Sequence, residues 1–512
     1  MNNMGILSLL PPIIAIIIAV KTKNVILSLF ISVFVGVFVV VGYLPGFAVT
    51  TMIKDYFFVQ LMDSYNAGVL VLLVFIGGFV SLMEKSGGAI AFAEKTSKFI
   101  NTRVKAQIAA WLGGLLIFFS DLGTPLIIGP IFEPIFDKLK ISREKLAFII
   151  DSTASPVCVL VPFIGWGVYV MGLIQKEFDA LKIGESDWSA FLHAVPFQFY
   201  SILALIIVPI IAFSGFEFSS MAKAEKRTQE TGKIFWPDSK PLRQKDYSDK
   251  INYNKSKAIL VWFPILILLA TLLVLLVPKG FPFKKIAGSE FRVALSTGYL
   301  FSGISLIAMM VYYKVKKFSE AFDIYIGGMK KMMNVSIILV LSWSLGLVLK
   351  NLGTANYVIQ IAEGNIPGFL IPAIIFIAGG CTSFATGSSW GTFAILMPLA
   401  IPMANSLNAP LYVTIAAVLS GGLFGDQLSP ISDTTILAST GAGCDHIDHV
   451  KTQMSYGIIN GSASFITYII AGIFPSVITL LVAVIIMIII LYFGAKFKGC
   501  RIPNTSINTK NK

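Results

Sequence analysis

The sequence predicts an all-α polytopic membrane protein with about 11 transmembrane helices plus two re-entrant hairpins in inverted repeats. Composition is the first reason, since 56% of the 512 residues are hydrophobic and only 13% are charged. A soluble protein of this size carries about twice that charged fraction. Length is the second reason, because uncharged runs such as 258–277 and 476–495 reach the ~20 residues that a helix needs to cross a bilayer.

The two hairpins are predicted from a repeated pentad, Ser-x-x-Gly-Thr, which lies inside apolar segments at 120–124 and 388–392. A pair of prolines follows each pentad at the same spacing. All five matched positions are 268 residues apart: Ser120 and Ser388, Gly123 and Gly391, Thr124 and Thr392, Pro130 and Pro398, and Pro134 and Pro402. A shared register of five positions indicates an internal duplication.

The duplication divides the chain into five parts. They are N-terminal transmembrane helices (1–59), a first repeat with hairpin 108–136 (60–215), a basic cytoplasmic linker with two connecting helices (216–319), a second repeat with hairpin 369–405 (320–475), and a last transmembrane helix with a cytoplasmic tail (476–512). The Lys, Asp, Glu and Ser content of 216–257 predicts a solvated loop in that part of the linker.

The distribution of basic residues predicts the orientation. With the N-terminus outside and both hairpins re-entrant, 32 of the 40 Lys and Arg residues fall on the cytoplasmic side. This bias agrees with the positive-inside rule and predicts a multi-pass protein of the plasma (cell) membrane with a cytoplasmic C-terminus. The hairpins then enter from opposite sides of the bilayer, as in inverted repeats. Because these loops explain the net charge of +13, we expect no nucleic-acid partner.

The hairpin tips are predicted to bind an ion or a solute, because non-helical backbone at membrane depth is tolerated only inside protein or beside a water-filled cavity. Gly123 and Gly391 are expected to permit the chain reversal. Hydroxyl oxygens suit a hard cation such as sodium, and the tips offer them at Ser120, Thr124, Ser388, Ser389 and Thr392. The helix amino termini after the tips suit an anionic substrate group. Close helix packing through small residues is the structural alternative.

A second pair of motifs follows the hairpins, Asp-Ser-Thr-Ala-Ser-Pro at 151–156 and Gly-Asp-Gln-Leu-Ser-Pro-Ile-Ser-Asp-Thr-Thr at 425–435. The proline in each removes a backbone donor and predicts a helix break. Acidic residues at membrane depth are costly and mark functional sites. We therefore predict ion-binding residues at Asp121, Asp151, Ser155, Asp426, Ser429, Asp433 and Thr434, with Asp151, Asp426 and Asp433 as sodium ligands. The alternatives are helix caps and pairs with lysine.

A third stretch, Gly441 to His449, holds two of the three histidines. We expect it to form a loop at the cytoplasmic surface. His446 and His449 are candidates for pH sensing there, because histidine titrates near neutral pH. A helix-start loop capped by aspartate is the alternative. A zinc site is only weakly indicated, because this short stretch offers three soft ligands, Cys444, His446 and His449.

At these residues the sequence resembles a known family. Thr386 to Ile395, Phe424 to Ile436, Gly441 to His449 and Lys145 to Val157 are similar to the NhaC-type sodium/proton antiporter family, which looks like part of a larger ion-transporter group. The resemblance implies sodium and proton exchange, with some relatives exchanging organic anions or carrying amino acids. Many relatives carry Asp-Asp-x-x-Asn at the first tip, whereas this chain has the single acid Asp121.

The leading hypothesis is a secondary active transporter, a Na+/H+ antiporter with alternating access. The alternative is a sodium-coupled transporter or exchanger of a small carboxylate or amino acid. An enzyme is not expected, since Leu423 occupies the position where an intramembrane aspartyl protease needs glycine. A passive channel fits broken helices in inverted repeats less well. The expected partners are sodium ions, protons, a small organic anion or amino acid, and the lipid bilayer. No cofactor is expected, and the sequence is compatible with a homo-oligomer.

Overall fold

The computed structural model describes residues 4–22, 24–88, 91, 100–240, 256–281, 288–354, 356–357, 360 and 366–502. Within these ranges the chain is helical except for connecting segments and two short strands, β1 (Phe216–Phe218) and β2 (Gly499–Arg501). The N-terminal part comprises η1 (Gly5–Leu9), α1 (Leu10–Thr22), α2 (Val25–Val40), α3 (Pro45–Thr51), η2 (Met52–Phe58) and α4 (Val59–Met62).

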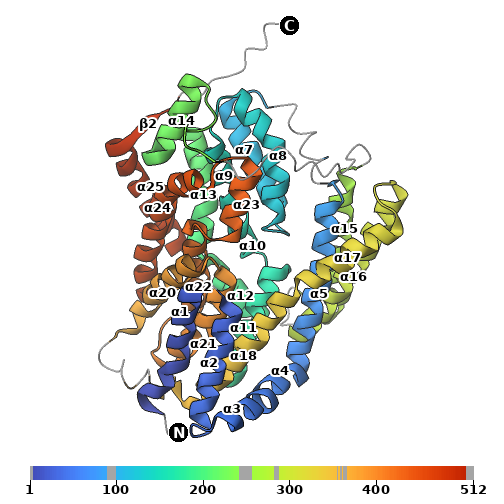
Figure 1. The fold of residues 1–512 in the computed structure, drawn as a ribbon, viewed down its shortest axis with the longest axis vertical. Coiled ribbons are helices and arrows are strands. Elements are labelled where there is room, and N and C mark those ends of the chain that lie inside the picture. Colours follow the sequence, from blue (N-terminus) through green and yellow to red (C-terminus); the bar gives the residue numbers. More distant parts are fainter. Residues whose placement is uncertain are drawn as a thin grey trace.

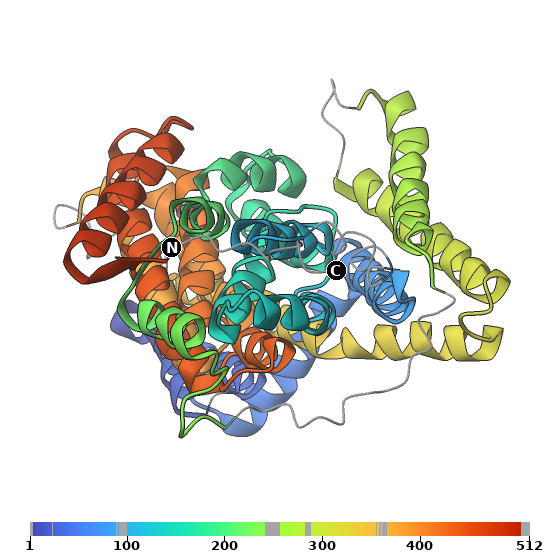
Figure 2. The same ribbon diagram turned by 90° about the horizontal axis from the view of Figure 1, so that it is seen from above.

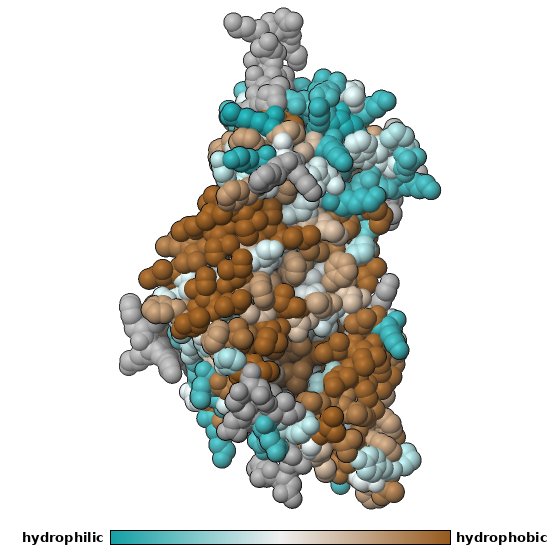
Figure 3. All heavy atoms as spheres, turned by 90° about the vertical axis from the view of Figure 1, so that its left-hand side faces the viewer, coloured by the Kyte–Doolittle hydropathy of each residue, from teal (hydrophilic) through white to brown (hydrophobic). Residues whose placement is uncertain are grey.

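The membrane character predicted from composition is confirmed. Eight helices in the described ranges are long and apolar enough to cross a membrane, or up to ten if each bent pair is counted as one span. Figure 3 shows apolar side chains in a broad band that ends at a hydrophilic cap. Two expected spans are divided by breaks, and the division of 146–173 lowers the count below 11, whereas α22 of the second region is still long enough to be counted. Region 146–173 forms α9 (Arg143–Ser152), α10 (Ser155–Cys158) and α11 (Gly165–Leu181), and region 411–440 forms α22 (Leu411–Leu428) and α23 (Asp433–Ala442).

Both predicted hairpins consist of two helices joined by a short tip. The first is α7 (Arg103–Leu116) with α8 (Gly123–Lys138), and the second is α20 (Ile371–Thr386) with α21 (Ser389–Ser406). In Figure 1, α7 and α8 lie in the upper half of the molecule, whereas α21 lies in the lower half. Each second arm carries its proline pair within the helix. The hairpins therefore approach the middle from opposite ends.

A group of helices stands apart from the hairpins. It contains α5 (Ser64–Lys85), α15 (Ile259–Leu276), α16 (Gly288–Tyr312) and α17 (Phe318–Lys331), and α18 (Met333–Leu352) leads back into the body. Figure 2 shows α15, α16 and α17 as an arm beside the body. Helix α5 packs against both α16 and α17. An added Cβ at Gly77 or Gly78 would meet α17 atoms of Gly328 or Tyr325, so glycine permits this close approach.

The remaining helices complete the body. They are α12 (Asp187–Ala194), α13 (Phe199–Ser214), α24 (His446–Ile473) and α25 (Thr479–Lys498), with the short turns η3 (Val195–Phe197), η5 (Val277–Lys279) and η6 (Gly368–Leu370). Helix α25 leads into β2, which pairs antiparallel with β1. In Figure 1 this pair lies near α14 (Ser219–Thr231) at the upper end, opposite the start of α1.

The linker does not match the predicted solvated loop where it is described. Residues Ser219–Thr231 form helix α14 directly after β1. The expectation failed because its charged side chains pair across the interface with other elements. Glu225 forms an ion pair with Arg103, and Arg227 forms one with Glu144 at 2.9 Å. Residues 241–255 of the linker lie outside the described part of the chain.

Candidate functional site

The repeated pentads make the same hydrogen bonds in both hairpins. The Gly123 amide donates to Ser120 Oγ at 2.9 Å, and the Gly391 amide donates to Ser388 Oγ at 3.2 Å. Thr124 and Thr392 each donate from Oγ1 to the carbonyl of the matching serine at 2.9 Å. The serine hydroxyls satisfy glycine amides that a helix start leaves unpaired, and the threonine hydroxyls add a second bond to each serine carbonyl. The matched hydroxyls therefore order the two tips.

The chain reversal does not depend on Gly123 and Gly391, contrary to expectation. Both are in the first turns of their helices, and neither has a positive φ. At the second tip the reversal uses Gly387, whose φ is +67° and whose added Cβ would lie 2.7 Å from the Ile431 carbonyl oxygen. Gly123 and Gly391 instead allow close approach, since a Cβ there would meet Ser120 or Val25.

The two predicted helix breaks lie against each other. Asp151 is in the last turn of α9, and Asp426 is in the last turn of α22. Gln427 Nε2 is 3.5 Å from Ser152 Oγ, and its Oε1 accepts a hydrogen bond from the Tyr200 hydroxyl at 2.7 Å. The structure thus brings together two carboxylates that are 275 residues apart in sequence, each beside the end of a helix.

Asp151 is almost completely buried, with 1% of its surface exposed. Its Oδ2 accepts a hydrogen bond from Gln453 Nε2 at 2.5 Å, and this amide also donates to the Gln427 carbonyl at 2.6 Å. Thr435 Oγ1 lies 3.4 Å from the same carboxylate oxygen. His449 Nε2 lies 3.5 Å away, and neither ring nitrogen of His449 has a hydrogen-bond partner among the described residues. Helix α24 therefore brings an amide and an imidazole to this carboxylate.

Asp426 is also buried and faces the second hairpin. Ser389 Oγ, in the first turn of α21, donates to Asp426 Oδ2 at 3.3 Å. Ser429 Oγ, in the break, donates to the Phe384 carbonyl of α20 at 2.7 Å. Ser432 and Thr434 hydroxyls are 3.0 Å apart where α23 begins. These contacts connect the second break with the second tip.

The first tip meets the first break in a corresponding way. Cys158 Sγ of α10 lies 3.1 Å from the Phe118 carbonyl oxygen. Ser120 Oγ donates to Glu84 Oε1 of α5 at 2.5 Å. Asp121, beside Ser120, is half-buried. Glu84 therefore supplies a second carboxyl group at a tip whose own sequence carries one acid.

Helix α11 connects the two halves of this region. Trp166, near its start, lies with its ring centroid 4.9 Å from that of Trp390 in the second hairpin. The Tyr169 hydroxyl donates to the Trp390 carbonyl at 2.7 Å. The side chain of Phe118 at the first tip packs against Phe163. The segment between the first break and α11 therefore contacts both tips.

The remaining candidates differ in their surroundings. Ser155 is 3% exposed, and its hydroxyl has no hydrogen-bond partner in the described part of the chain. Asp433 is exposed in the first turn of α23. Asp445 caps α24 by accepting from the Asp448 amide at 3.0 Å, as one sequence interpretation predicted. His446 contacts the Pro430 carbonyl at 2.6 Å and Ser439 Oγ at 3.1 Å, whereas His449 is buried.

Sequence reasoning missed four polar residues of this region: Glu84, Tyr200, Gln427 and Gln453. Gln453 and His449 are four residues apart on α24, so they share one helix face. This spacing could have predicted that both face the same site. Nothing local in the sequence indicates that α5 would bring Glu84 to the first tip.

Neither central carboxylate has a Lys or Arg partner among the described residues. The imidazole of His449 lies beside Asp151, and the Ser389 hydroxyl contacts Asp426. The described residues contain no group of three or more His, Cys, Asp or Glu side chains arranged to hold a metal ion. A sodium ion here would therefore draw much of its shell from hydroxyl, amide and backbone oxygens.

Comparisons with known proteins agree with a transporter. The chain is 30% identical over 505 residues to an "Uncharacterized protein" of Haemophilus influenzae, covering 96% of this chain and 95% of that protein. A segment of 94 residues is 38% identical to the malate-2H(+)/Na(+)-lactate antiporter of Bacillus subtilis, covering 18% of this chain and 20% of that antiporter.

The fold is similar to that of the YdaH transporter of Alcanivorax borkumensis, whose crystal structure was described as having an unusual topology. The TM-score is 0.56 at 14% identity, with 83% of this chain and 88% of that chain covered. The sequence model of the Na+/H+ antiporter family matches residues 157–473. This range includes the second hairpin and the second helix break, and it begins just after the first break. The protein therefore belongs to the Na+/H+ antiporter family and is a multi-pass membrane transporter.

Proposed function

We propose that this antiporter binds sodium and protons in alternation at the two helix breaks, with Asp151 and Asp426 as the central ligands. The observation that carries the proposal is the pairing of two buried carboxylates with two helix C-termini and with no lysine or arginine partner in the described residues. An unpaired buried carboxylate is costly. A bound sodium ion or a proton removes that cost.

The position of the carboxylates favours a cation. The negative end of a helix dipole and its unpaired carbonyls lie at the C-terminus. In secondary transporters, the C-terminal ends of broken helices coordinate sodium ions near the bilayer midplane. Asp151 and Asp426 occupy the last turns of α9 and α22. Sodium bound there would balance both the carboxylate charge and the helix ends.

Other polar groups complete the proposed site. The Thr435 hydroxyl supplies a neutral oxygen beside Asp151. The Ser155 hydroxyl, which has no partner among the described residues, lies four residues further along the chain at the start of α10. Gln453 positions the Asp151 carboxylate through its amide. His449 provides a second proton-accepting group at 3.5 Å, so Asp151 and His449 together can hold a proton when sodium leaves. The hydrogen bond from Ser389 to Asp426 connects this carboxylate to the second hairpin, so sodium binding or protonation at Asp426 can change a contact of that hairpin.

We propose that the end carrying α14 faces the cytoplasm and that the N-terminus faces outside. The 32 basic residues assigned to the inner side by sequence support this orientation through the positive-inside rule. The hydrophilic cap in Figure 3 supports it as well. We also propose that the protein lies in the plasma membrane with this orientation.

The test is sodium-driven proton flux in proteoliposomes that contain an internal pH-sensitive dye and no organic solute. The wild-type protein is expected to move protons when a sodium gradient is applied. Asp151→Asn and Asp426→Asn should each lose this flux while remaining inserted and folded. Glu230→Gln is the matched control, because Glu230 is 60% exposed on α14 and should exchange at the wild-type rate.

Two results would contradict the proposal. Wild-type flux in both Asn variants would remove the assigned roles of the central carboxylates. Flux that appears only after addition of malate, lactate, arginine or another small solute would instead favour the sodium-coupled organic carrier.

A further inference from the structure

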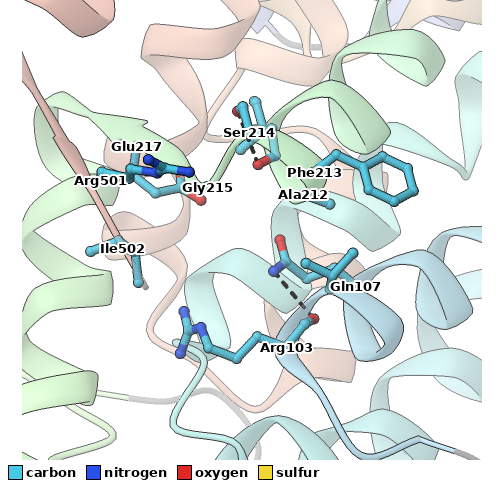
Figure 4. A pocket seen from close by; sticks show the side chains of 11 residues that line it. Arg103, Gln107, Ala212, Phe213, Ser214, Gly215, Glu217, Arg501 and Ile502 are labelled. Atoms are coloured by element: carbon cyan, nitrogen blue, oxygen red, sulfur yellow. Dashed lines mark hydrogen bonds between the residues drawn. The ribbon is translucent and has the colours of Figure 1, made fainter. Parts of the chain in front are cut away.

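A cavity of about 440 Å³ lies at the end of the molecule that carries α14, separate from the helix breaks. Its walls come from the start of α7, the end of α13 and the paired strands β1 and β2 (Figure 4). The lining residues that matter below are Arg103, Gln107, Phe213, Glu217, Arg501 and Ile502. Nothing in the proposed exchange mechanism uses this cavity.

The side chain of Gln107 points into the cavity with an unused acceptor. Gln107 is 6% exposed, and its Nε2 donates to the Arg103 carbonyl at 3.3 Å. This bond leaves Oε1 without a hydrogen-bond partner among the described residues. Figure 4 shows the amide pointing from α7 into the space bordered by Arg501, Phe213 and Ile502. Leaving a buried acceptor unpaired is destabilising, so the cavity suits a ligand with a hydroxyl or amine donor.

The charge of the cavity is positive. Arg501 is exposed and contacts the Phe216 ring, but it forms no ion pair in the described part of the chain. The Arg103 guanidinium is held by Glu225 and by the Leu139 and Lys140 carbonyls. Among the described residues, one carboxylate lines this cavity, that of Glu217, which already accepts from Lys145 Nζ at 2.6 Å and from the Tyr456 hydroxyl. Arg501 is therefore the cation available to an anionic ligand.

The apolar part of the cavity faces the membrane boundary. Val104, Ile211 and Ala212 line it, and Phe213 is 71% exposed at the end of α13. At the same end, Tyr492 and Phe493 of α25 are 63% and 51% exposed. Exposed aromatic side chains gather where helices leave the hydrocarbon. The cavity thus combines a free arginine, an unused acceptor and an apolar wall at the level of lipid headgroups.

We propose that this cavity binds one anionic phospholipid with a hydroxylated headgroup, of the phosphatidylglycerol type. The lipid phosphate pairs with Arg501, a headgroup hydroxyl donates to Gln107 Oε1, and an acyl chain follows Phe213 and Ile211. Basic pockets between helices on the cytoplasmic side bind anionic headgroups in this manner. The assignment does not depend on the ion site, so either can fail alone.

The test is native mass spectrometry of the purified full chain after delipidation and addition of phosphatidylglycerol, phosphatidylethanolamine or phosphatidylcholine. One retained phosphatidylglycerol per chain is expected, with the other two lipids lost at the same collision energy. Arg501→Gln and Gln107→Leu should each lose the retained lipid. Lys105→Gln is the matched control, because Lys105 is exposed on the same helix and bonds to Asn101; it should keep the lipid.

Three results would overturn the proposal. If the chain retains phosphatidylethanolamine as well as it retains phosphatidylglycerol, the cavity does not select an anionic lipid. Retention in both cavity variants at the wild-type level would assign the lipid to another surface. If glycerol 3-phosphate, which has no acyl chain, raises the melting temperature of the wild type as much as phosphatidylglycerol, the ligand is a soluble anion and the lipid assignment fails.

Discussion

Two regions of the molecule bury carboxylates, and they differ in the charge that faces them. Near α14, Glu144, Glu217 and Glu225 pair with Arg227, Lys145 and Arg103. At the helix breaks, Asp151 and Asp426 face Gln453, His449 and Ser389 instead. The five carboxylates are all at most 4% exposed. Burial alone therefore does not distinguish the two regions.

The difference indicates which carboxylates are available to a transported ion. A buried ion pair is already neutral, so binding a further cation would require its partner to leave. A buried carboxylate without a cation is stabilised by any proton or sodium ion that reaches it. We accordingly propose that the region near α14 holds helices together, while the helix breaks exchange ions. Variants that add or remove a single charge in either region test this difference.

The largest effect is expected from giving Asp151 a permanent cation. Gln453→Lys places an ammonium group where the Gln453 amide now lies 2.5 Å from Asp151 Oδ2, and so reproduces the kind of pair that Lys145 and Glu217 form. Sodium-driven proton flux should fall to the background of empty liposomes, while thermal stability is retained. Flux and melting temperature measured on one preparation check both parts.

Gln453→Leu is the matched control for that variant. It removes the amide donor without adding a charge, so the carboxylate stays available to sodium. A hydrogen bond to a charged group contributes about 1.5–3 kcal/mol, so flux should fall by about 10- to 150-fold but remain measurable. Wild-type flux in Gln453→Lys would mean that Asp151 does not need to bind sodium.

The converse variant removes one member of a pair near α14. Glu225→Gln leaves Arg103 buried with no carboxylate, and breaking a buried pair costs about 3–5 kcal/mol. We expect a clear loss of thermal stability in detergent, but normal sodium-driven flux per folded molecule. Glu230→Gln, on the exposed face of the same helix, should change stability by at most about 1 kcal/mol.

The sequence predicts the two hairpins and the two breaks, because local features determine them. The pentads and proline pairs share a fixed register, and Pro156 and Pro430 each mark a helix interruption. The composition of 216–240 was misleading because the structure of this segment depends on distant residues. Three of its charged residues, Glu217, Glu225 and Arg227, are buried in pairs with α7 and α9, and a pairing partner cannot be inferred from local composition.

Long-range partners of the site could not be inferred. Gln453 and Asp151 are 302 residues apart, and only the packing of α24 on α9 brings them together. The role of glycine was assigned to the wrong positions because the pentad contains Gly123 and Gly391, whereas the turn uses Gly387, which has no counterpart at the first tip. Sequence identifies where helices break, but tertiary packing decides which side chains meet there.

The smallest effects are expected from single hydroxyl groups, and they extend the comparison from charges to neutral oxygens. Ser388 caps α21 by accepting from the Gly391 amide, so Ser388→Ala should cost about 1 kcal/mol of stability and leave the sodium dependence of flux unchanged. Ser155 Oγ is buried without a partner among the described residues, so Ser155→Ala removes an unpaired polar group. Its stability should stay constant or rise, while the sodium concentration for half-maximal flux rises about 5- to 10-fold, the effect of losing about 1 kcal/mol or slightly more of binding. If Ser155→Ala lowers stability and leaves the sodium dependence unchanged, the hydroxyl is structural, and the lack of a partner would no longer identify an ion ligand.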